Sequence, residues 1–573
     1  MVTVLTRREL LSRRHSKPAG EPTGLAAPQR LRSLAVTTSL VELGWRRSRD
    51  HHPEIRYQVL RDGHVVAHVR GERFTDRAVA AATTYRYAVR TLDGKRHGHS
   101  TRILVVTTPA VVGAPVAPPP APAPAAAAPA PPTLTQPMVD RLYWRAGFGP
   151  TDAERAQWTG QPVAGLVNYL ITAPNVLSTD ATPPTYYGNP IDPLDSEDEL
   201  IMEWLDTMQR STNPLVERLT FFWHRHFAVS QDSGIDSPSL LAYRDRLRNY
   251  ADFSANPTAT FHDLAVEMTT EDSAMSQYLT GYLNVKEAPN ENYGREFMEL
   301  FTLGVTDANG NPNYTQDDVH DLARAFTGYQ IDFGTTPPVV VFNAGEFDDT
   351  PKTIFGQTGN FDAVQGVGLV LSQPNHAPFL VTELWNEFIA APIPADALAA
   401  LTSTYLHSGT QLQPLMAGIL SHPLIFDSLE EPTMVKSPVV YTVGVLRATG
   451  APLQAVQTDA LSDMLQQPYH PPNVAGWPGG LAWMTTGTSV ARFTLIPECQ
   501  GVMSALTDVL GETGAQAYAR AYAAVGSPWL SPETQTVLQQ LAASAPSTHA
   551  SQRLERQYAL RSLMLGGPDG QVM

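Results

Sequence analysis

Residues 289–304 read PNENYGREFMELFTLG, and their spacing indicates an α-helix with two unlike faces. Apolar side chains recur at helical spacing on one side: Tyr293, Phe297, Leu300 and Phe301. Polar side chains share the other side: Glu291, Asn292, Arg295, Glu296 and Glu299. Asn290 suits an N-cap and Gly304 suits a helix exit. The stretch therefore predicts a helix anchored in a core, whose polar face forms either a site or a solvated surface.

The polar face offers two carboxylates at a useful spacing. Glu296 and Glu299 are three residues apart, so both can reach one metal ion or one substrate. If one is buried beside the other, its pKa rises and it can act as a general base. The competing interpretation is an ion-paired surface, because Glu291, Arg295 and Glu299 follow one another at intervals of four. We take Glu296, Glu299 and Arg295 as candidate catalytic residues and Asn292 as a candidate substrate-binding residue.

Helical periodicity continues on both sides of this stretch, over residues 137–573. Capping boxes begin helices at Thr151 and Thr315. We predict further helices at 138–146, 200–208, 215–229, 240–250, 261–268, 273–279, 376–390, 394–406, 411–420, 437–448, 457–466, 490–510, 514–524, 531–543 and 549–565, and a short strand at 339–342. These residues predict one large, mainly α-helical domain.

Residues 28–108 have a different pattern, that of short strands separated by turns. We predict strands at 34–36, 41–45, 57–60, 64–66, 84–90 and 103–106, with a hairpin turn at Asp62-Gly63. This is the pattern of a small all-β, immunoglobulin-like sandwich. In detail, Trp45, the FTD at 74–76 and the TTYRYAV at 83–89 resemble a fibronectin type III domain. The resemblance implies a module that spaces or binds, with its aromatic residues in the core.

Two segments of biased composition bound the β module. Residues 109–132 contain ten prolines and ten alanines, so we predict an extended, semi-rigid linker over 109–136. Residues 1–27 predict a disordered basic tail. Arg7-Arg8 is followed by no apolar core, so a degenerate or mis-started export signal is the alternative.

Charge and cysteine content exclude several classes of protein. Residues 1–108 carry 20 Lys and Arg against 9 Asp and Glu, whereas the rest carries 20 against 47. Phosphates would be repelled by the acidic part, so nucleic acid is an unfavourable partner for the large domain. The basic module is suited to an anionic polymer, or is simply well solvated. The single cysteine excludes a disulfide framework. The sequence contains no apolar run of roughly 18 residues, so we predict no transmembrane helix.

Eight blocks of the large domain match a known family in order and spacing. They are RAGFGP (145–150), FWHRHF (222–227), NENYGREFMELFTLG (290–304), YTQDDV (314–319), ARAFTGY (323–329), KTIFG (352–356), KSP (436–438) and PPNVAGWP (471–478). Over roughly 137–500 the chain resembles the bacterial family called domain of unknown function 1800. The resemblance implies an exported or cell-surface protein and names no reaction. Phe347 replaces a histidine that is usual in the family, and Glu383 replaces a common lysine.

The matching blocks supply the remaining candidate site residues. His226 lies on the apolar side of its helix, so we expect a hydrogen-bonded core histidine or, alternatively, a base or metal ligand. Arg324 is a candidate anion clamp, and we expect Lys352 and Lys436, two of only three lysines after residue 132, to pair with the carboxylates of 289–304. Trp477, with Asn473, lies in a proline-rich loop that forms either a pocket wall for stacking a sugar or a plug for the core.

Two functions are consistent with these residues. The first is an extracytoplasmic hydrolase that acts on a cell-wall or carbohydrate polymer by acid/base chemistry, or with a divalent metal held by His226, Glu296 and Glu299. The second is a non-catalytic cell-surface protein for binding or assembly. A cytoplasmic location stays open. If other candidate residues lie close to Glu296, the polar face forms a site; if none does, it is an ion-paired helix surface.

Overall fold

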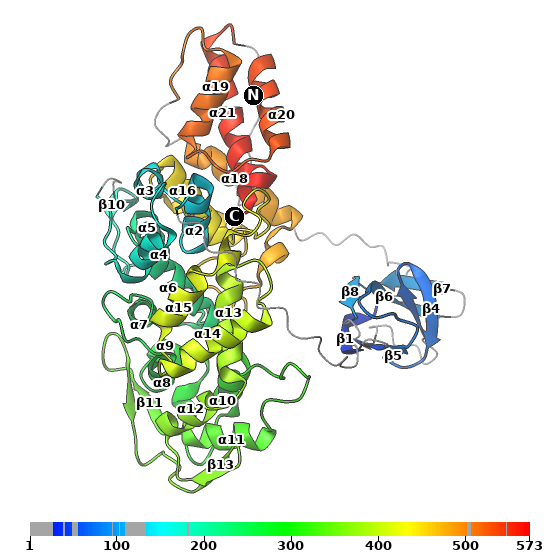
Figure 1. Ribbon diagram of the computed structural model, residues 1–573. Helices are drawn as coiled ribbons and strands as arrows, with labels where there is room; N and C mark the ends of the chain where they lie inside the picture. Colours follow the sequence, from blue (N-terminus) through cyan, green and yellow to red (C-terminus); the bar gives the residue numbers. More distant parts are fainter. Residues whose placement is uncertain are drawn as a thin grey trace, which may run out of the picture. The chain divides into compact units, whose positions relative to one another are not determined.

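The computed structural model describes residues 27–37, 40–47, 56–93, 96–101, 103–108, 133–179, 183–500, 506–545 and 547–573. It divides into two compact units, Met1–Ala126 and Ala127–Met573, so the division falls inside the predicted linker. Most of that linker and of the predicted basic tail lies outside the described residues. The fold class is confirmed: small antiparallel sheets come first, and a large helical region follows (Figure 1).

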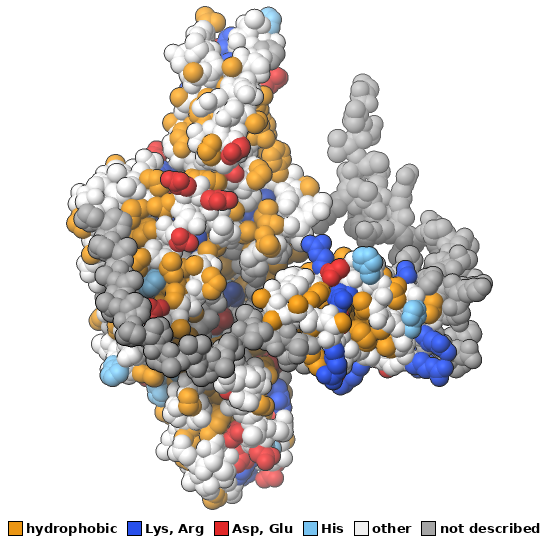
Figure 2. Space-filling model, turned by 45° about the vertical axis from the view of Figure 1, so that its right-hand side comes forward, with side chains coloured by type: hydrophobic (Ala, Val, Ile, Leu, Met, Phe, Trp, Pro, Cys, Tyr) orange, Lys and Arg blue, Asp and Glu red, His pale blue; other side chains and the backbone are white. Residues whose placement is uncertain are grey.

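The first unit contains two antiparallel sheets. One has the order β1 (Gln29–Thr37), β2 (Leu40–Arg46) and β5 (Arg73–Asp76). The other has the order β4 (His64–Val69), β3 (Arg56–Arg61), β6 (Thr84–Asp93) and β7 (Arg96–Ser100), and β8 (Leu104–Thr107) also pairs with β6. Asp62 and Gly63 both have positive φ, as the tight turn between β3 and β4 requires. Trp45 packs edge-on against Tyr57 in the core, at a ring separation of 5.5 Å. Figure 2 shows many Lys and Arg side chains on the visible face of this unit.

The second unit begins with α2 to α9 and continues through the quoted stretch. The bounds are α2 (Gln136–Arg145), α3 (Asp152–Trp158), α4 (Val163–Thr172), β9 (Thr185–Tyr186), β10 (Asn189–Pro190), α5 (Glu197–Arg210), α6 (Pro214–His226), α7 (Ser237–Asn249), α8 (Phe261–Thr270), α9 (Ser273–Tyr278), α10 (Glu291–Glu296), the π-helix η4 (Phe297–Thr302), α11 (Gln316–Ala325), β11 (Tyr329–Asp332), β12 (Val339–Phe342), β13 (Lys352–Ile354), β14 (Gln357–Gly359) and α12 (Ala363–Leu371). Short 3-10 turns lie at Gln231–Ser233 and Gly281–Leu283.

The remaining helices complete this unit. They are α13 (His376–Phe388), α14 (Ala395–His407), α15 (Leu412–Leu420), α16 (Pro438–Thr449), α17 (Ala455–Asp463), α18 (Thr486–Gln500), α19 (Gly514–Ala524), α20 (Pro532–Ser544) and α21 (Ala550–Gly566), with 3-10 turns at Pro423–Phe426, Gly480–Trp483 and Pro568–Gln571. Figure 1 shows α19, α20 and α21 side by side at one end of the unit, and α10, α11 and β13 at the other. One continuous apolar core joins them, with Trp204, Trp223 and Trp385 fully buried.

Local signals account for most helix starts. The predicted capping boxes are present at Thr151 with Glu154 and at Thr315 with Asp318. The strand at 339–342 and the helix at 514–524 have the predicted bounds. Prediction missed α4 and α12. Both are short, with buried residues at helical spacing but few strongly polar residues opposite them, so the contrast between their two faces is weak.

Candidate functional site

The quoted stretch is a helix of two kinds rather than one continuous α-helix. Asn290 caps α10 as predicted, since its side chain accepts a hydrogen bond from the Asn292 amide. From Phe297 the helix widens to π geometry, and the Leu303 amide donates to the carbonyl of Met298, five residues back. The predicted α-helix is therefore wrong in its second half. A π-helix has more residues per turn than an α-helix, so the side chains after Phe297 do not follow the polar face predicted for an α-helix.

Buried side chains bind the last carbonyls of this stretch. His226 Nε2 donates to the Phe301 carbonyl (2.9 Å), and His376 Nδ1 donates to the Thr302 carbonyl (3.1 Å). The Leu303 carbonyl accepts from the side-chain amides of Asn313 and Asn375. A helix leaves its final carbonyls unpaired, and these side chains supply the missing donors. His226 is thus held as a core histidine, and burial lowers its pKa to about 3.

Glu296 and Glu299 remain neighbours across the change of helix type. Partial burial raises the pKa of Glu296, the charge of Glu299 raises it further, and Arg295 opposes both. Glu299 accepts a hydrogen bond from the Tyr314 hydroxyl (3.1 Å). Arg295 instead donates to Gln316 (2.8 Å) and lies 3.6 Å from Glu291. Asn292 is exposed. The polar face is therefore divided between a carboxylate pair and a separate ion pair.

The structure does not assemble the predicted metal site. Throughout the described ranges, no three His, Cys, Asp or Glu side chains are grouped so that they could hold a metal ion. The Nε2–H of His226 donates to a backbone carbonyl and not to a carboxylate, and only 8% of the residue is exposed. The set of His226, Glu296 and Glu299 is therefore corrected to a core histidine and a separate carboxylate pair.

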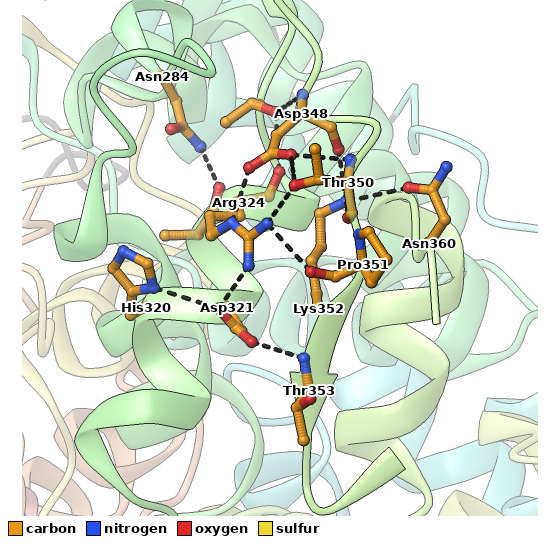
Figure 3. Close-up of polar contacts among 12 residues, drawn as sticks. Asn284, His320, Asp321, Arg324, Asp348, Thr350, Pro351, Lys352, Thr353 and Asn360 are labelled. Atoms are coloured by element: carbon orange, nitrogen blue, oxygen red, sulfur yellow. Dashed lines mark hydrogen bonds and ion pairs between the residues drawn. The ribbon is translucent and has the colours of Figure 1, made fainter. Parts of the chain in front are cut away.

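Arg324 and Lys352 meet, but around Asp348 rather than Glu296 (Figure 3). Arg324 donates to Asp348 (2.7 Å), to Asp321 (2.9 Å), and to Thr350 and Pro351. Burial alone would raise the pKa of Asp348, but hydrogen bonds from Arg324 and Thr350 hold it well below its usual range. All three nitrogen atoms of the guanidinium donate hydrogen bonds, so Arg324 links α11 to the segment that leads into the β13–β14 hairpin.

Lys352 completes this network. Its Nζ donates to the carbonyls of Asp348 and Thr350 and to Asn360, and it lies 4.9 Å from the ring centre of Phe347. Phe347 is one of the two residues noted from the sequence as departures from the resembled pattern. The expected pairing of Lys352 with the carboxylates of 289–304 is wrong, since backbone carbonyls occupy the ammonium instead.

The other predicted site residues lie in two further places. Lys436 donates to the Gly570 carbonyl and lies over the ring of Trp144, so its expected pairing with those carboxylates is also wrong. Trp477 is 3% exposed and stacks on Phe221, which makes it the core plug rather than the pocket wall. Asn473 is exposed and its side chain accepts from the Ala475 amide.

A cavity of about 320 Å³ lies beside this plug, and sequence reasoning missed it. Its charged lining comes from Arg218 and Arg225 on α6 and Glu387 on α13, and residues 478–481 and Trp483 form one wall. Arg218 Nη2 lies 2.8 Å from Glu387 Oε1, while Arg218 Nε has no hydrogen-bond partner in the described part of the chain. Arg225 lies 3.4 Å from Glu383 and 3.9 Å from Glu387.

Gly476 fits the proline-rich loop against this cavity. Its φ is +70°, and a Cβ there would lie 2.4 Å from the Arg225 carbonyl oxygen. The close approach needs glycine, and it brings residues 478–480 to the cavity while Trp477 enters the core. A signal for the cavity was present in the sequence: Arg218 and Arg225 are seven residues apart on α6, a spacing that places both on one face of the helix.

Comparison with known proteins identifies the helical unit. A family model described as "Protein of unknown function (DUF1800)" matches residues 141–572. The chain belongs to this family. The DUF1800 match contains every charged residue of the cavity and every candidate residue predicted from the sequence.

Other comparisons add little to the DUF1800 assignment. No curated protein matches the chain. A family 28 exopolygalacturonase from Yersinia enterocolitica is 17% identical over 15% of this chain and 20% of that one, with a TM-score of 0.14. The fibronectin type-III domain of human fibronectin type III domain containing protein 3 is 12% identical over 17% of this chain and 96% of that one, with a TM-score of 0.15. Within the described residues, no helix has the length and apolar character needed to cross a membrane.

Proposed function

We propose that the DUF1800 domain is a binding domain that captures an anionic group of a carbohydrate or cell-wall polymer in the cavity between α6, α13 and residues 478–483. One observation carries the proposal. Arg218 is 3% exposed, lines an open cavity, and has an Nε without a partner in the described residues. A buried donor left unpaired is unfavourable, and a carboxylate or phosphate oxygen would satisfy it.

The charges around the cavity support an anion rather than a cation or a neutral ligand. Two guanidinium groups line it against one carboxylate. Behind them, Arg145 contacts Met434 of the lining, and burial together with Arg141 and Arg218 lowers the pKa of Arg145 to about 9. Burial is the larger cause, and the two neighbouring arginines add positive charge on this side of the cavity. Arg225 is 27% exposed at its side chain, so an incoming anion can reach it.

Binding to a matched pair of sugars tests the proposal. The full-length chain should bind an oligoglucuronate and not the uncharged oligoglucoside of the same linkage and length. Arg225→Gln should weaken oligoglucuronate binding by about tenfold or more, because a charge-assisted hydrogen bond contributes about 1.5–3 kcal/mol. Arg295→Gln removes a half-exposed arginine far along the chain and serves as the matched control. Equal binding by the two variants would remove the proposal.

The setting of this activity is also proposed. Residues 28–108 are a fibronectin type III-like module that spaces or presents the domain at 137–573, with 109–136 as linker, and the protein works at the cell surface outside the cytoplasm. The two-sheet architecture and the basic charge of residues 1–108 support a presenting module that favours an anionic surface. Fractionation of cells that produce the full chain tests the location: recovery of all protein from the cytoplasm contradicts it.

A second candidate function is acid/base hydrolysis of a polymer at Glu296 and Glu299. The raised pKa of Glu296 beside a second carboxylate favours it, because a carboxyl group that keeps its proton to a higher pH than usual can act as a general acid or base. Its test is release of new sugar ends from an oligoglucuronate. Loss of that release in Glu296→Gln, with binding retained, supports hydrolysis; no release by the unaltered chain removes it.

A further inference from the structure

A second and larger cavity, of about 620 Å³, lies between the start of α2, the segment 429–436 and the connection from α19 to α20. Aromatic side chains form much of its wall: Trp144, Tyr522 and Trp529. Lys436 also lines it and is 5% exposed. No part of the function proposed above uses this cavity.

Lys436 has an unusual environment for a lysine. Its Nζ donates to the Gly570 carbonyl (2.9 Å) and lies 3.7 Å from the ring centre of Trp144. The nearby charge of Arg492, which donates to the Lys436 carbonyl oxygen, has the same sign. Burial, with the charge of Arg492, lowers the pKa of Lys436 to about 7.

The acidic groups around the cavity do not neutralise the charge of a Lys436 ammonium. Asp140 is held by Arg155 at 2.6 Å, Asp569 accepts from the Ser531 amide at 2.7 Å, and Glu430 is exposed. Arg141, which like Arg155 also lines the cavity, donates to the carbonyls of Ile425, Asp427 and Ser428. An ammonium at Lys436 therefore has no carboxylate bonded to it among the described residues, and the uncharged amine is favoured.

The amine is also fixed in place. The Lys436 amide donates to Gln571, which ties its backbone to the last 3-10 turn. The indole of Trp144 fits where Gly149 and Gly444 leave room, because a Cβ at Gly444 would lie 2.3 Å from the ring. A lysine that is buried, partly uncharged at pH 7 and held beside a cavity with aromatic walls has the properties of a nucleophilic amine.

We propose that Lys436 is a reactive amine that captures a small aldehyde or ketone with an apolar or aromatic body, by forming an imine in this cavity. The nitrogen lone pair attacks the carbonyl carbon, and a proton passes from nitrogen to the new alkoxide. The carbinolamine then loses water, so that a C=N bond replaces the C=O bond and water is the only other product. No oxidant or reductant is needed.

The five lysines of the full chain make this test direct: Lys17, Lys95, Lys286, Lys352 and Lys436. Benzaldehyde with cyanoborohydride at pH 7 traps imines, and peptide mass spectrometry assigns them. At pH 7 about half of an amine with a pKa near 7 is uncharged, against about one part in 2,500 for an ordinary lysine. We expect Lys436 to be modified at least about tenfold faster than exposed Lys286. Lys352 is the matched buried control, with three acceptors on its ammonium.

Two further measurements separate reactivity from a purely structural role. The rate at Lys436 should reach half its maximum near pH 7, and Trp529→Ala, which strips the aromatic wall without touching the amine, should slow trapping of benzaldehyde. Modification of Lys436 no faster than Lys286, or only after the chain is unfolded in urea, would overturn the proposal.

Discussion

Arg218 and Glu387 form a nearly buried ion pair that joins α6 to α13, with 2.8 Å between Nη2 and Oε1 and side-chain exposures of 4% and 15%. Arg218 also lines the cavity, and the Nε of the same guanidinium has no hydrogen-bond partner in the described residues. One arginine therefore fixes two helices and keeps a donor for a ligand.

The first prediction concerns this pair. Glu387→Gln removes the charge that compensates a buried guanidinium but keeps an acceptor, so we expect the free energy of unfolding in urea to fall by about 1–3 kcal/mol. Glu383→Gln is the matched control, because Glu383 is 36% exposed and 3.4 Å from Arg225. Its effect should stay below about 1 kcal/mol. Similar losses in both variants would mean that burial of the pair is unimportant.

The second prediction concerns the pH dependence of Glu296. Its pKa is raised in the folded chain, so this group favours folding below its unfolded pKa and loses that contribution as pH rises through the folded value. Glu296→Gln should therefore stabilise the protein at pH 7, and the gain should vanish below about pH 4.3. Unfolding in urea at several pH values measures it. Glu291→Gln, on the same helix, is the control, and a pH-independent gain in Glu296→Gln contradicts the assignment.

The third prediction concerns the histidines that cap the π-helical end. Burial lowers the pKa of His226 to about 3 and that of His376 to about 4, so the unfolded chain takes up these protons first as pH falls below about 6.5. Stability should then fall by up to about 1.4 kcal/mol per pH unit for each such histidine. His226→Phe should reduce proton uptake on unfolding near pH 5 by about one. Unchanged uptake in His226→Phe would show that His226 is not held neutral.

Sequence and structure agree best where local chemistry decides the outcome. The capping boxes at Thr151 and Thr315 and the Asp62-Gly63 turn depend on residues within a few positions of one another, and all are present. The π-helix was not predictable from periodicity. It depends on His226 and His376, which come from distant helices and bind its last carbonyls.

The candidate site was harder to predict because residue type does not fix a partner. Lys352 was expected to pair with the carboxylates of 289–304 and Arg324 to bind an anion, yet both bind Asp348 instead. The proline-rich loop of Trp477 suited either a pocket wall or a core plug. The close approach of Gly476 to α6 decides for the plug, because it leaves the indole buried. The cavity depends on contacts of Arg218 and Arg225 with Glu387, which is distant from both in the sequence, so the pattern of α6 alone does not predict it.

The fourth prediction concerns that glycine. Gly476→Ala forces a Cβ to 2.4 Å from the Arg225 carbonyl oxygen at a φ of +70°, so it should destabilise the chain by about 1–2 kcal/mol or more and weaken anion binding. Gly479→Ala is the matched control, since its Cβ would meet only Arg225 Nη1 at 3.9 Å. Thermal unfolding compares them. Equal tolerance of the two substitutions would show that the loop does not depend on this close approach.

The affinity of Glu387→Gln for oligoglucuronate, measured by titration calorimetry on the full chain, tests the central claim most directly. Glu387 is the one carboxylate lining the cavity, so its neutralisation should tighten binding by about five- to tenfold, since removing a like charge at short range contributes about 1 kcal/mol. Arg225→Gln should change affinity in the opposite direction. Because lost stability cannot by itself tighten binding, a gain in Glu387→Gln supports an anion in this cavity. Unchanged or weaker binding in Glu387→Gln would contradict it.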